Sequence, residues 1–206
     1  MTDRFLTLAF DTSAAHCAAA LLLGDQLLED ETVEMAKGQA EAIMPMLEAL
    51  LTRHGFHWAD VTTLGVGIGP GNFTGIRISV AAARGLALSL GVKAVGVSRF
   101  EAQAWGHPRP ITSLIEARKN HVYLQQLQDG GTTPPEFLTR DEATLRIGDG
   151  PAIGAGLGNP TPVATGVARY AALRTSITTT RPAPMYIRAA DAAPPRDPAP
   201  VILDQV

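Results

Sequence analysis

The chain has 206 residues, a formal net charge of −3 and a single cysteine, and 46% of its residues are hydrophobic against 18% charged. This is a globular composition, long enough for one large or two small domains with a core. The acidic balance argues against a protein that holds nucleic acid unaided, and the lone Cys17 excludes an intrachain disulfide and a multi-cysteine metal site. No apolar run is long enough to cross a bilayer and no signal peptide is visible, so we expect a cytoplasmic protein without a membrane partner.

The chain opens with three short apolar segments that predict an antiparallel meander. Residues 5–10, 17–23 and 26–33 have the composition of strands, and Gly24-Asp25 forms the last turn. Connections this short exclude parallel pairing, which needs a crossover of a dozen or more residues. Cys17 begins the second segment, where a buried structural thiol is expected rather than a nucleophile.

Helices and strands alternate after this meander. Apolar residues recur at helical spacing from Ala40 to Leu51, and Pro45 should kink this helix or confine its regular part to the residues after the proline. The elements predicted next are a strand, a helix, a strand and a helix, at residues 63–68, 74–90, 93–97 and 99–105. The order β-β-β-α-β-α-β-α predicts an α/β fold, a mixed sheet with flanking helices.

A proline-rich stretch at residues 107–110 predicts a boundary between two subdomains. The first would span residues 1–107, and the second, smaller one would span residues 108–206. Within the second, residues 111–115 and 121–127 have the pattern of paired strands, and the proline-rich stretch from residue 182 reads as an extended tail.

Two segments could face a ligand. Gly67–Gly75 places four glycines between a strand and a helix, which can expose backbone amides, but a tight structural turn explains the glycines as well. The polar residues that follow the first strand could hold a metal-bound phosphate or could form an ordinary Asx turn. The candidate nucleotide- or phosphate-facing residues are Asp11, Thr12, Ser13, Gly69, Gly71 and Asn72.

No catalytic constellation can be identified in the sequence. Among the histidines only His54 and His57 lie close together, and Gly55 between them indicates a helix end rather than a ligand-bearing face. We therefore predict no catalytic residues and no metal site.

The helix at 74–90 has an unusual outer face. One side carries bulky apolar residues that should pack on the sheet, whereas the opposite side is small and largely apolar instead of charged. This pattern predicts burial against another helix, either of a partner or of this chain's own second subdomain. The predicted interface residues are Ile78, Ala81, Ala82, Gly85 and Ser89.

Taken together, these segments resemble the TsaB (YeaZ) family. The family pattern at the strand, loop and helix is close to Gly-Pro-Gly-Ser-Phe-Thr-Gly-Leu-Arg-Ile-Gly, and residues 69–79 keep this frame, with Asn72 and Ser79 as departures. Gln39 also departs, because the family usually has histidine there. Further similar segments are Asp11–Ser13, Ala82–Ala87, Glu116–Tyr123 and Pro184–Arg188.

The resemblance implies an actin-like/sugar-kinase (ribonuclease H-like) fold of two related subdomains, the second reduced. It implies a non-catalytic partner of TsaD, the enzyme that threonylcarbamoylates tRNA adenosine next to the anticodon. Arg99 and Gln103 occupy the positions of TsaD's metal-binding histidine pair and cannot hold iron or zinc as histidines do. The resemblance further implies that TsaE docks on the pair, that tRNA binds only through the complex, and that ADP or ATP can lie at the boundary with TsaD. We expect a homodimer when TsaD is absent.

Three alternatives remain open on the sequence. A small-molecule kinase or ATPase of the same superfamily would need a full second domain, and the short proline-rich region after residue 108 counts against it. A metallopeptidase would need the missing histidine ligands. A generic dimeric interaction module would explain the apolar helix face but not the family motifs.

Overall fold

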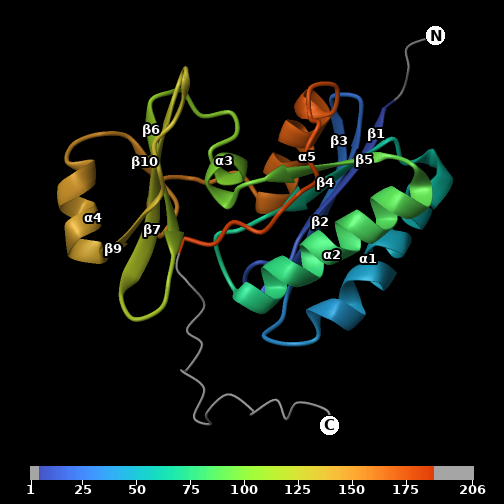
Figure 1. The fold of residues 1–206 in the computed structure, drawn as a ribbon, viewed down its shortest axis with the longest axis horizontal. Coiled ribbons are helices and arrows are strands. Elements are labelled where there is room, and N and C mark those ends of the chain that lie inside the picture. The colour runs from blue at the N-terminus through green and yellow to red at the C-terminus, as the bar shows by residue number, and fades with distance from the viewer. Residues whose placement is uncertain (1–4, 188–206) are drawn as a thin grey trace, which may run out of the picture.

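The computed structural model describes residues 5–187 (Figure 1). Its elements in chain order are β1 (Leu6–Asp11), β2 (His16–Leu23), β3 (Gln26–Glu34), α1 (Gln39–Arg53), the 3₁₀ turn η1 (Trp58–Asp60), β4 (Thr63–Gly67), α2 (Phe73–Leu90), β5 (Lys93–Val97), α3 (Arg99–Gln103), β6 (Ile111–Glu116), β7 (His121–Gln128), β8 (Gly131–Thr132), β9 (Glu136–Thr139), α4 (Arg140–Ile147), β10 (Ala152–Ile153) and α5 (Val163–Arg174). The proline-rich stretch after residue 187 lies outside the described residues.

The first sheet has the strand order β3-β2-β1-β4-β5. β1, β2 and β3 pair antiparallel, which confirms the predicted meander, and β4 and β5 add in parallel to β1. The loops that follow β1, β4 and β5 therefore leave the same edge of the sheet. The mixed sheet with flanking helices predicted from the sequence is confirmed.

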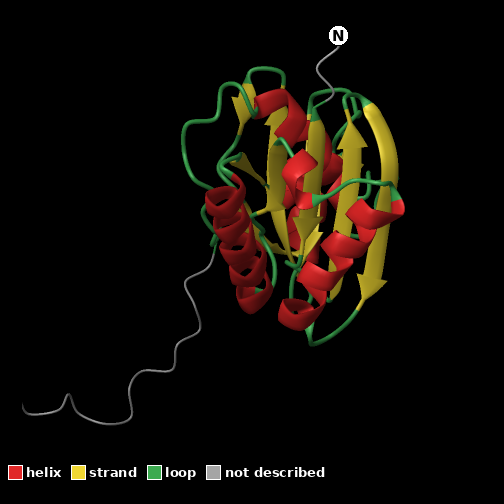
Figure 2. Cartoon of the chain, turned by 90° about the vertical axis from the view of Figure 1, so that its right-hand side faces the viewer, coloured by secondary structure: helices red, strands yellow, loops and turns green. Residues whose placement is uncertain are grey.

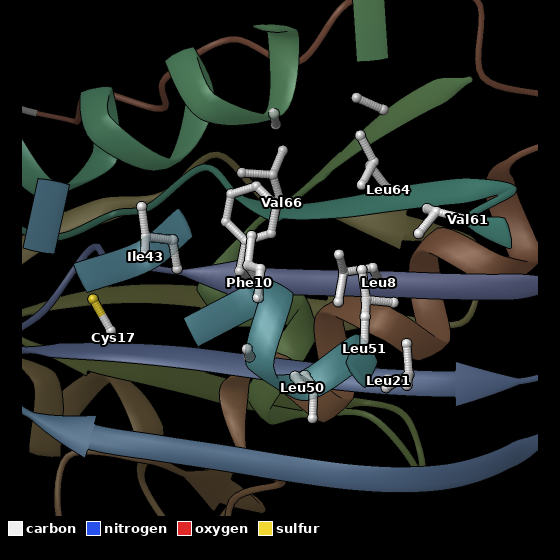
Figure 3. Close-up of a cluster of buried hydrophobic side chains, with 14 of the residues drawn as sticks. Leu8, Phe10, Cys17, Leu21, Ile43, Leu50, Leu51, Val61, Leu64 and Val66 are labelled. Atoms are coloured by element: carbon white, nitrogen blue, oxygen red, sulfur yellow. The ribbon is translucent and has the colours of Figure 1, made fainter. Parts of the chain in front are cut away.

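Helices cover both faces of this sheet (Figures 1 and 2). On one face, Leu8 and Phe10 of β1 pack with Ile43 and Leu50 of α1, and α2 lies beside α1 (Figure 3). On the other face, Ala9 belongs to a separate cluster with α5. This alternation follows from the two-residue period of a strand. Each fully buried large side chain contributes about 1.5–3 kcal/mol to folding.

α5 approaches the sheet closely because the strand residues beneath it are small. A Cβ added at Gly65 would lie 2.9 Å from the Ala171 Cβ and 3.0 Å from Val167 Cγ1. Ala9 and Ala18 line the same surface. The sequence analysis did not predict α5, although it closes one whole face of the first sheet.

α1 runs through Pro45 and is not confined to the residues after it. Pro45 lies on the exposed side of the helix, where the backbone carbonyl that loses its partner can bond water. Of the two expected effects of Pro45, confinement of the regular helix to the residues after it is therefore wrong, and the kink stays a prediction.

The second sheet has the order β10-β6-β7-β8, and β9 pairs with β7. α4 packs on one face through Ala143, and α3 contributes Phe100 to a cluster on strands of the same sheet. α4 and β10 both lie in segment 140–158, for which the sequence predicted no element. α5 packs on the first sheet, so the chain after residue 108 contributes to the structure around both sheets.

α2 has 18 residues and a mean hydropathy of 1.2, which by length and composition alone would let it cross a membrane. A core helix of a soluble protein has the same composition, and α2 packs Ile76, Val80 and Ala83 against the sheet.

Candidate functional site

A cavity of about 710 Å³ lies where the loops after β1 and β4, the start of α3 and the second sheet meet. This is the edge at which parallel strands of α/β proteins commonly present ligand sites. The C-terminal segment closes one side of the cavity. Its lining residues are Ser13, Ala14, Pro70, Gly71, Asn72, Phe73, Thr74, Ile76, Arg99, Glu116, Ala117, Arg118, Tyr123, Phe137, Met185, Tyr186 and Ile187.

The loop after β1 is occupied by bonds within the protein. The Asp11 carboxylate is buried and accepts hydrogen bonds from the Ser13 hydroxyl at 2.8 Å and from His16 Nε2 at 2.8 Å. The Thr12 hydroxyl donates to the Gly75 carbonyl at 2.7 Å. Of the three candidate residues in this loop, Asp11, Thr12 and Ser13, only Ser13 lines the cavity.

The glycine loop packs directly on this segment. A Cβ at Gly67 would lie 1.8 Å from Asp11 Oδ2, and one at Gly71 would lie 2.1 Å from the Ser13 carbonyl oxygen. The Asn72 side chain accepts hydrogen bonds from the backbone N–H groups of Thr74 and Gly75, at 2.9 and 3.2 Å. The N-terminal donors of α2 are thus partly satisfied by its own cap. The six candidate residues gather at one corner of the fold, and their role toward a ligand stays a prediction.

We expect Asp11 to contribute stability that depends on pH. Burial raises its pKa, but the hydrogen bond from His16, the Arg99 charge and the Ser13 hydroxyl outweigh burial and hold the pKa below its usual range. A depressed folded-state pKa stabilises the fold above the unfolded value of about 3.9, and this contribution disappears as pH falls through the folded pKa. Asp11→Asn should lose about 3–5 kcal/mol at pH 7.

Urea unfolding of the Asp11→Asn variant from pH 7 to below pH 4 measures this effect. The acid-dependent fall in stability should be shallower in the variant than in the wild type. The exposed Asp25→Asn is the matched control and should leave both quantities unchanged. Equal acid sensitivity of Asp11→Asn and wild type would contradict the assignment.

Arg99 and Gln103, which the family resemblance places where TsaD has its metal-binding histidines, have different surroundings. Arg99 lines the cavity, and its Nη1 donates to the Pro70 carbonyl at 3.4 Å. Gln103 Nε2 donates to the Ser113 hydroxyl at 2.7 Å and to the Leu114 carbonyl at 2.9 Å, which ties α3 to β6. Within residues 5–187, no three His, Cys, Asp or Glu side chains are grouped as a metal site. The expected absence of a metal stays a prediction.

The outer face of α2 is open in this structure. Ala81, Gly85 and Ser89 are exposed, Ile78 and Ala82 are half-buried, and a Cβ at Gly85 would meet no atom within 4 Å. Within residues 5–187, no part of the second subdomain covers this face. Burial of the face against a partner stays a prediction. The sequence analysis missed Leu88, which is 83% exposed beside the predicted residues.

Aromatic residues around the cavity were also missed. Tyr123 and Phe137 come from neighbouring strands with ring centroids 5.3 Å apart, and Phe73 and Tyr186 lie 5.0 Å apart at the side of α2. Arg77 stacks 3.7 Å from the Phe73 ring centroid and donates to the Tyr186 hydroxyl at 2.9 Å. These residues are far apart in sequence, and no local pattern links them.

The strand order β3-β2-β1-β4-β5 with helices on both faces is the predicted actin-like/sugar-kinase (ribonuclease H-like) fold. A solved structure of a Pseudomonas aeruginosa protein with similarity to peptidase YeaZ has a TM-score of 0.68 at 24% identity, and covers 89% of this chain and 100% of its own. YeaZ from Pseudomonas aeruginosa has a TM-score of 0.66 at 24% identity, covering 84% of this chain and 92% of its own. At this identity the likeness shows the fold alone.

Sequence comparison defines the family. A family model described as TsaD, tRNA N6-adenosine threonylcarbamoyltransferase, matches residues 33–139. The tRNA threonylcarbamoyladenosine biosynthesis protein TsaB of Escherichia coli K12 is 33% identical over 126 residues, which are 59% of this chain and 54% of that protein. An uncharacterised protein of Mycobacterium bovis is 30% identical over 149 residues, 71% of this chain and 69% of that protein. The chain belongs to the TsaB (YeaZ) family, and it spans about half the length of the TsaB relatives it matches.

Proposed function

We propose that this protein acts in the biosynthesis of threonylcarbamoyladenosine in tRNA, as a non-catalytic activating partner of a TsaD-type transferase. Relatives named tRNA threonylcarbamoyladenosine biosynthesis proteins support a role in this tRNA modification. The match to the TsaD family model supports a relationship to the transferase. Such a role belongs in the cytoplasm.

The observation that carries the proposed partnership is the open face of α2. The exposed side of α2 carries Arg77 and Arg84 along one edge. Beside them lies a small, largely uncharged strip, formed by Ala81, Gly85, Leu88 and Ser89. Small residues let a second helix backbone approach closely. TsaD, itself related to this family, is the occupant we propose, and a second copy of this chain takes its place when TsaD is absent.

A non-catalytic role agrees with the surroundings of α3. Arg99 cannot ligate a metal as histidine does, and the Gln103 amide is bound to Ser113 and Leu114. The net charge of −3 suits a subunit that meets tRNA only through the complex. In this scheme TsaE docks on the pair, and ADP or ATP can lie at the boundary with TsaD.

The alternative functions are less well supported. A kinase or ATPase needs a carboxylate free to hold a metal-bound phosphate, but Asp11 is engaged by Ser13 and His16. A metallopeptidase needs metal ligands that the described residues do not group together.

Reconstitution with TsaD and TsaE of the same organism tests the proposal. We expect this chain to co-purify with TsaD and modified tRNA to form only when both are present, with threonylcarbamoyladenosine measured by mass spectrometry of digested tRNA. This chain with TsaE alone should give no product. Full modification without this chain would refute the activating role, and product formed without TsaD would refute the non-catalytic one.

A further inference from the structure

Arg99 places a positive charge in the cavity, and no carboxylate among residues 5–187 forms an ion pair with it. The bond of Arg99 to the Pro70 carbonyl is long, at 3.4 Å. The only buried side-chain nitrogen or oxygen without a partner in residues 5–187 is on Arg109. The Arg99 donors that make no hydrogen bond are not in this set, so they are not buried and can be reached from the cavity. Burial lowers the pKa of Arg99, and the Asp11 charge raises it in part. A guanidinium in this position can take an anion in a bidentate geometry.

Aromatic rings from two parts of the fold line the same cavity. Tyr123 and Phe137 belong to the second sheet, and Phe73 and Tyr186 belong to α2 and the C-terminal segment. Arg77 holds the second pair through its stacking on Phe73 and its bond to Tyr186. A volume of about 710 Å³ is that of a small-molecule site, and the rings provide a flat apolar surface.

The described carboxylates near the cavity already bind other side chains of the protein. Asp11 is buried under Ser13 and His16, and Glu116 at the rim forms an ion pair with Arg140. Magnesium-bound polyphosphates are commonly held through one or two free carboxylates. Arg118 also lines the cavity, but it is exposed, whereas Arg99 is half-buried. The cavity therefore suits an anion with one acidic group at Arg99 that binds without a metal.

We propose that this cavity binds a small molecule with a flat ring and a single acidic group, without a metal ion. The acid, a carboxylate or one phosphate, is held by Arg99, and the ring lies against the aromatic walls. This site belongs to the isolated chain and does not depend on the proposed partnership with TsaD.

Ligand-observed NMR and calorimetry on the isolated full chain test the site. The anionic probes are benzoate, phenyl phosphate and adenosine monophosphate, each compared with its neutral counterpart benzamide, phenol or adenosine. We expect each anion that binds to do so at least about tenfold more tightly than its neutral counterpart, without magnesium. The benzoate and phenyl phosphate arms decide between carboxylate and phosphate.

Variants assign the binding to Arg99. Arg99→Gln should weaken binding about tenfold or more. Arg169→Gln should not change it, because Arg169 is a half-buried arginine that contacts the Asp25 carbonyl and does not line the cavity. Tyr123→Leu should weaken both anionic and neutral probes. Melting curves establish that each variant folds, and the comparison of anion with neutral probe on the wild type stands if Arg99→Gln does not fold.

Several results would overturn the proposal. One is that no anionic probe binds at about 10 mM, near the weak limit of fragment affinities. Another is that neutral and anionic probes bind equally well. The last two are an unchanged affinity in a folded Arg99→Gln variant and a preference for magnesium ATP. None of them bears on whether the chain activates TsaD.

Discussion

Gly75→Ala and Gly85→Ala should change the stability of this protein in opposite directions although both lie in α2. A Cβ at Gly75 would lie 1.9 Å from the Thr12 carbonyl oxygen, so the helix and the loop after β1 would have to separate. The Thr12 hydroxyl bond to Gly75, at 2.7 Å, would be disturbed as well. We expect Gly75→Ala to lower the free energy of unfolding by about 3 kcal/mol or more.

Gly85→Ala is the matched control for this change. The new methyl group meets nothing within 4 Å, and alanine is a better helix former by about 1 kcal/mol. Urea unfolding of both variants at low protein concentration, where self-association does not contribute, gives the comparison. A tolerated Gly75→Ala would mean that the loop after β1 is not fixed to α2 as the structure has it.

This contrast also shows what the sequence could predict. Hydrophobic periodicity was sufficient for β1 to β5 and for α2, because each of these elements buries one face with its own local pattern. The glycine loop was recognised as special, but two explanations fitted it. Which glycines contact Asp11, Ser13 or Thr12 depends on the pairing of β1 with β4, and that is set by the tertiary fold.

α5 was missed for a related reason. Ala164, Val167, Ala168 and Ala171 do recur at helical spacing, but their small side chains give a weak apolar signal. The surface that requires small residues is formed by Ala9 and other residues more than a hundred positions earlier. No local window contains both partners.

The candidate site was predicted only in part. The motifs located the loops, yet the cavity walls come from Phe73, Tyr123, Phe137 and Tyr186, which only the packing of two sheets and the C-terminal segment brings together. Arg99 was noted in the sequence as a missing metal ligand. Its position in the cavity, without an ion pair to any carboxylate in the described part of the chain, is not revealed by sequence spacing.

Gly85→Leu should leave the fold intact and weaken association. The added side chain extends from the exposed face of α2, where a Cβ has open space, so the isolated chain should keep or slightly gain stability. If TsaD packs on this face, the leucine separates two closely packed helices, which costs about 1–3 kcal/mol per site. Association with TsaD should weaken about tenfold to a hundredfold, and a symmetric homodimer should suffer more because it contains the site twice.

Size-exclusion chromatography and calorimetric titration with TsaD measure this loss, and thermal melting checks the fold. Thr144→Leu is the control, since it adds a leucine to the exposed side of α4, away from α2. A Gly85→Leu variant that binds TsaD as tightly as wild type would exclude the α2 face as the interface. A variant that loses TsaD binding but keeps its melting temperature would assign the outer face of α2 to the partner rather than to the protein's own core.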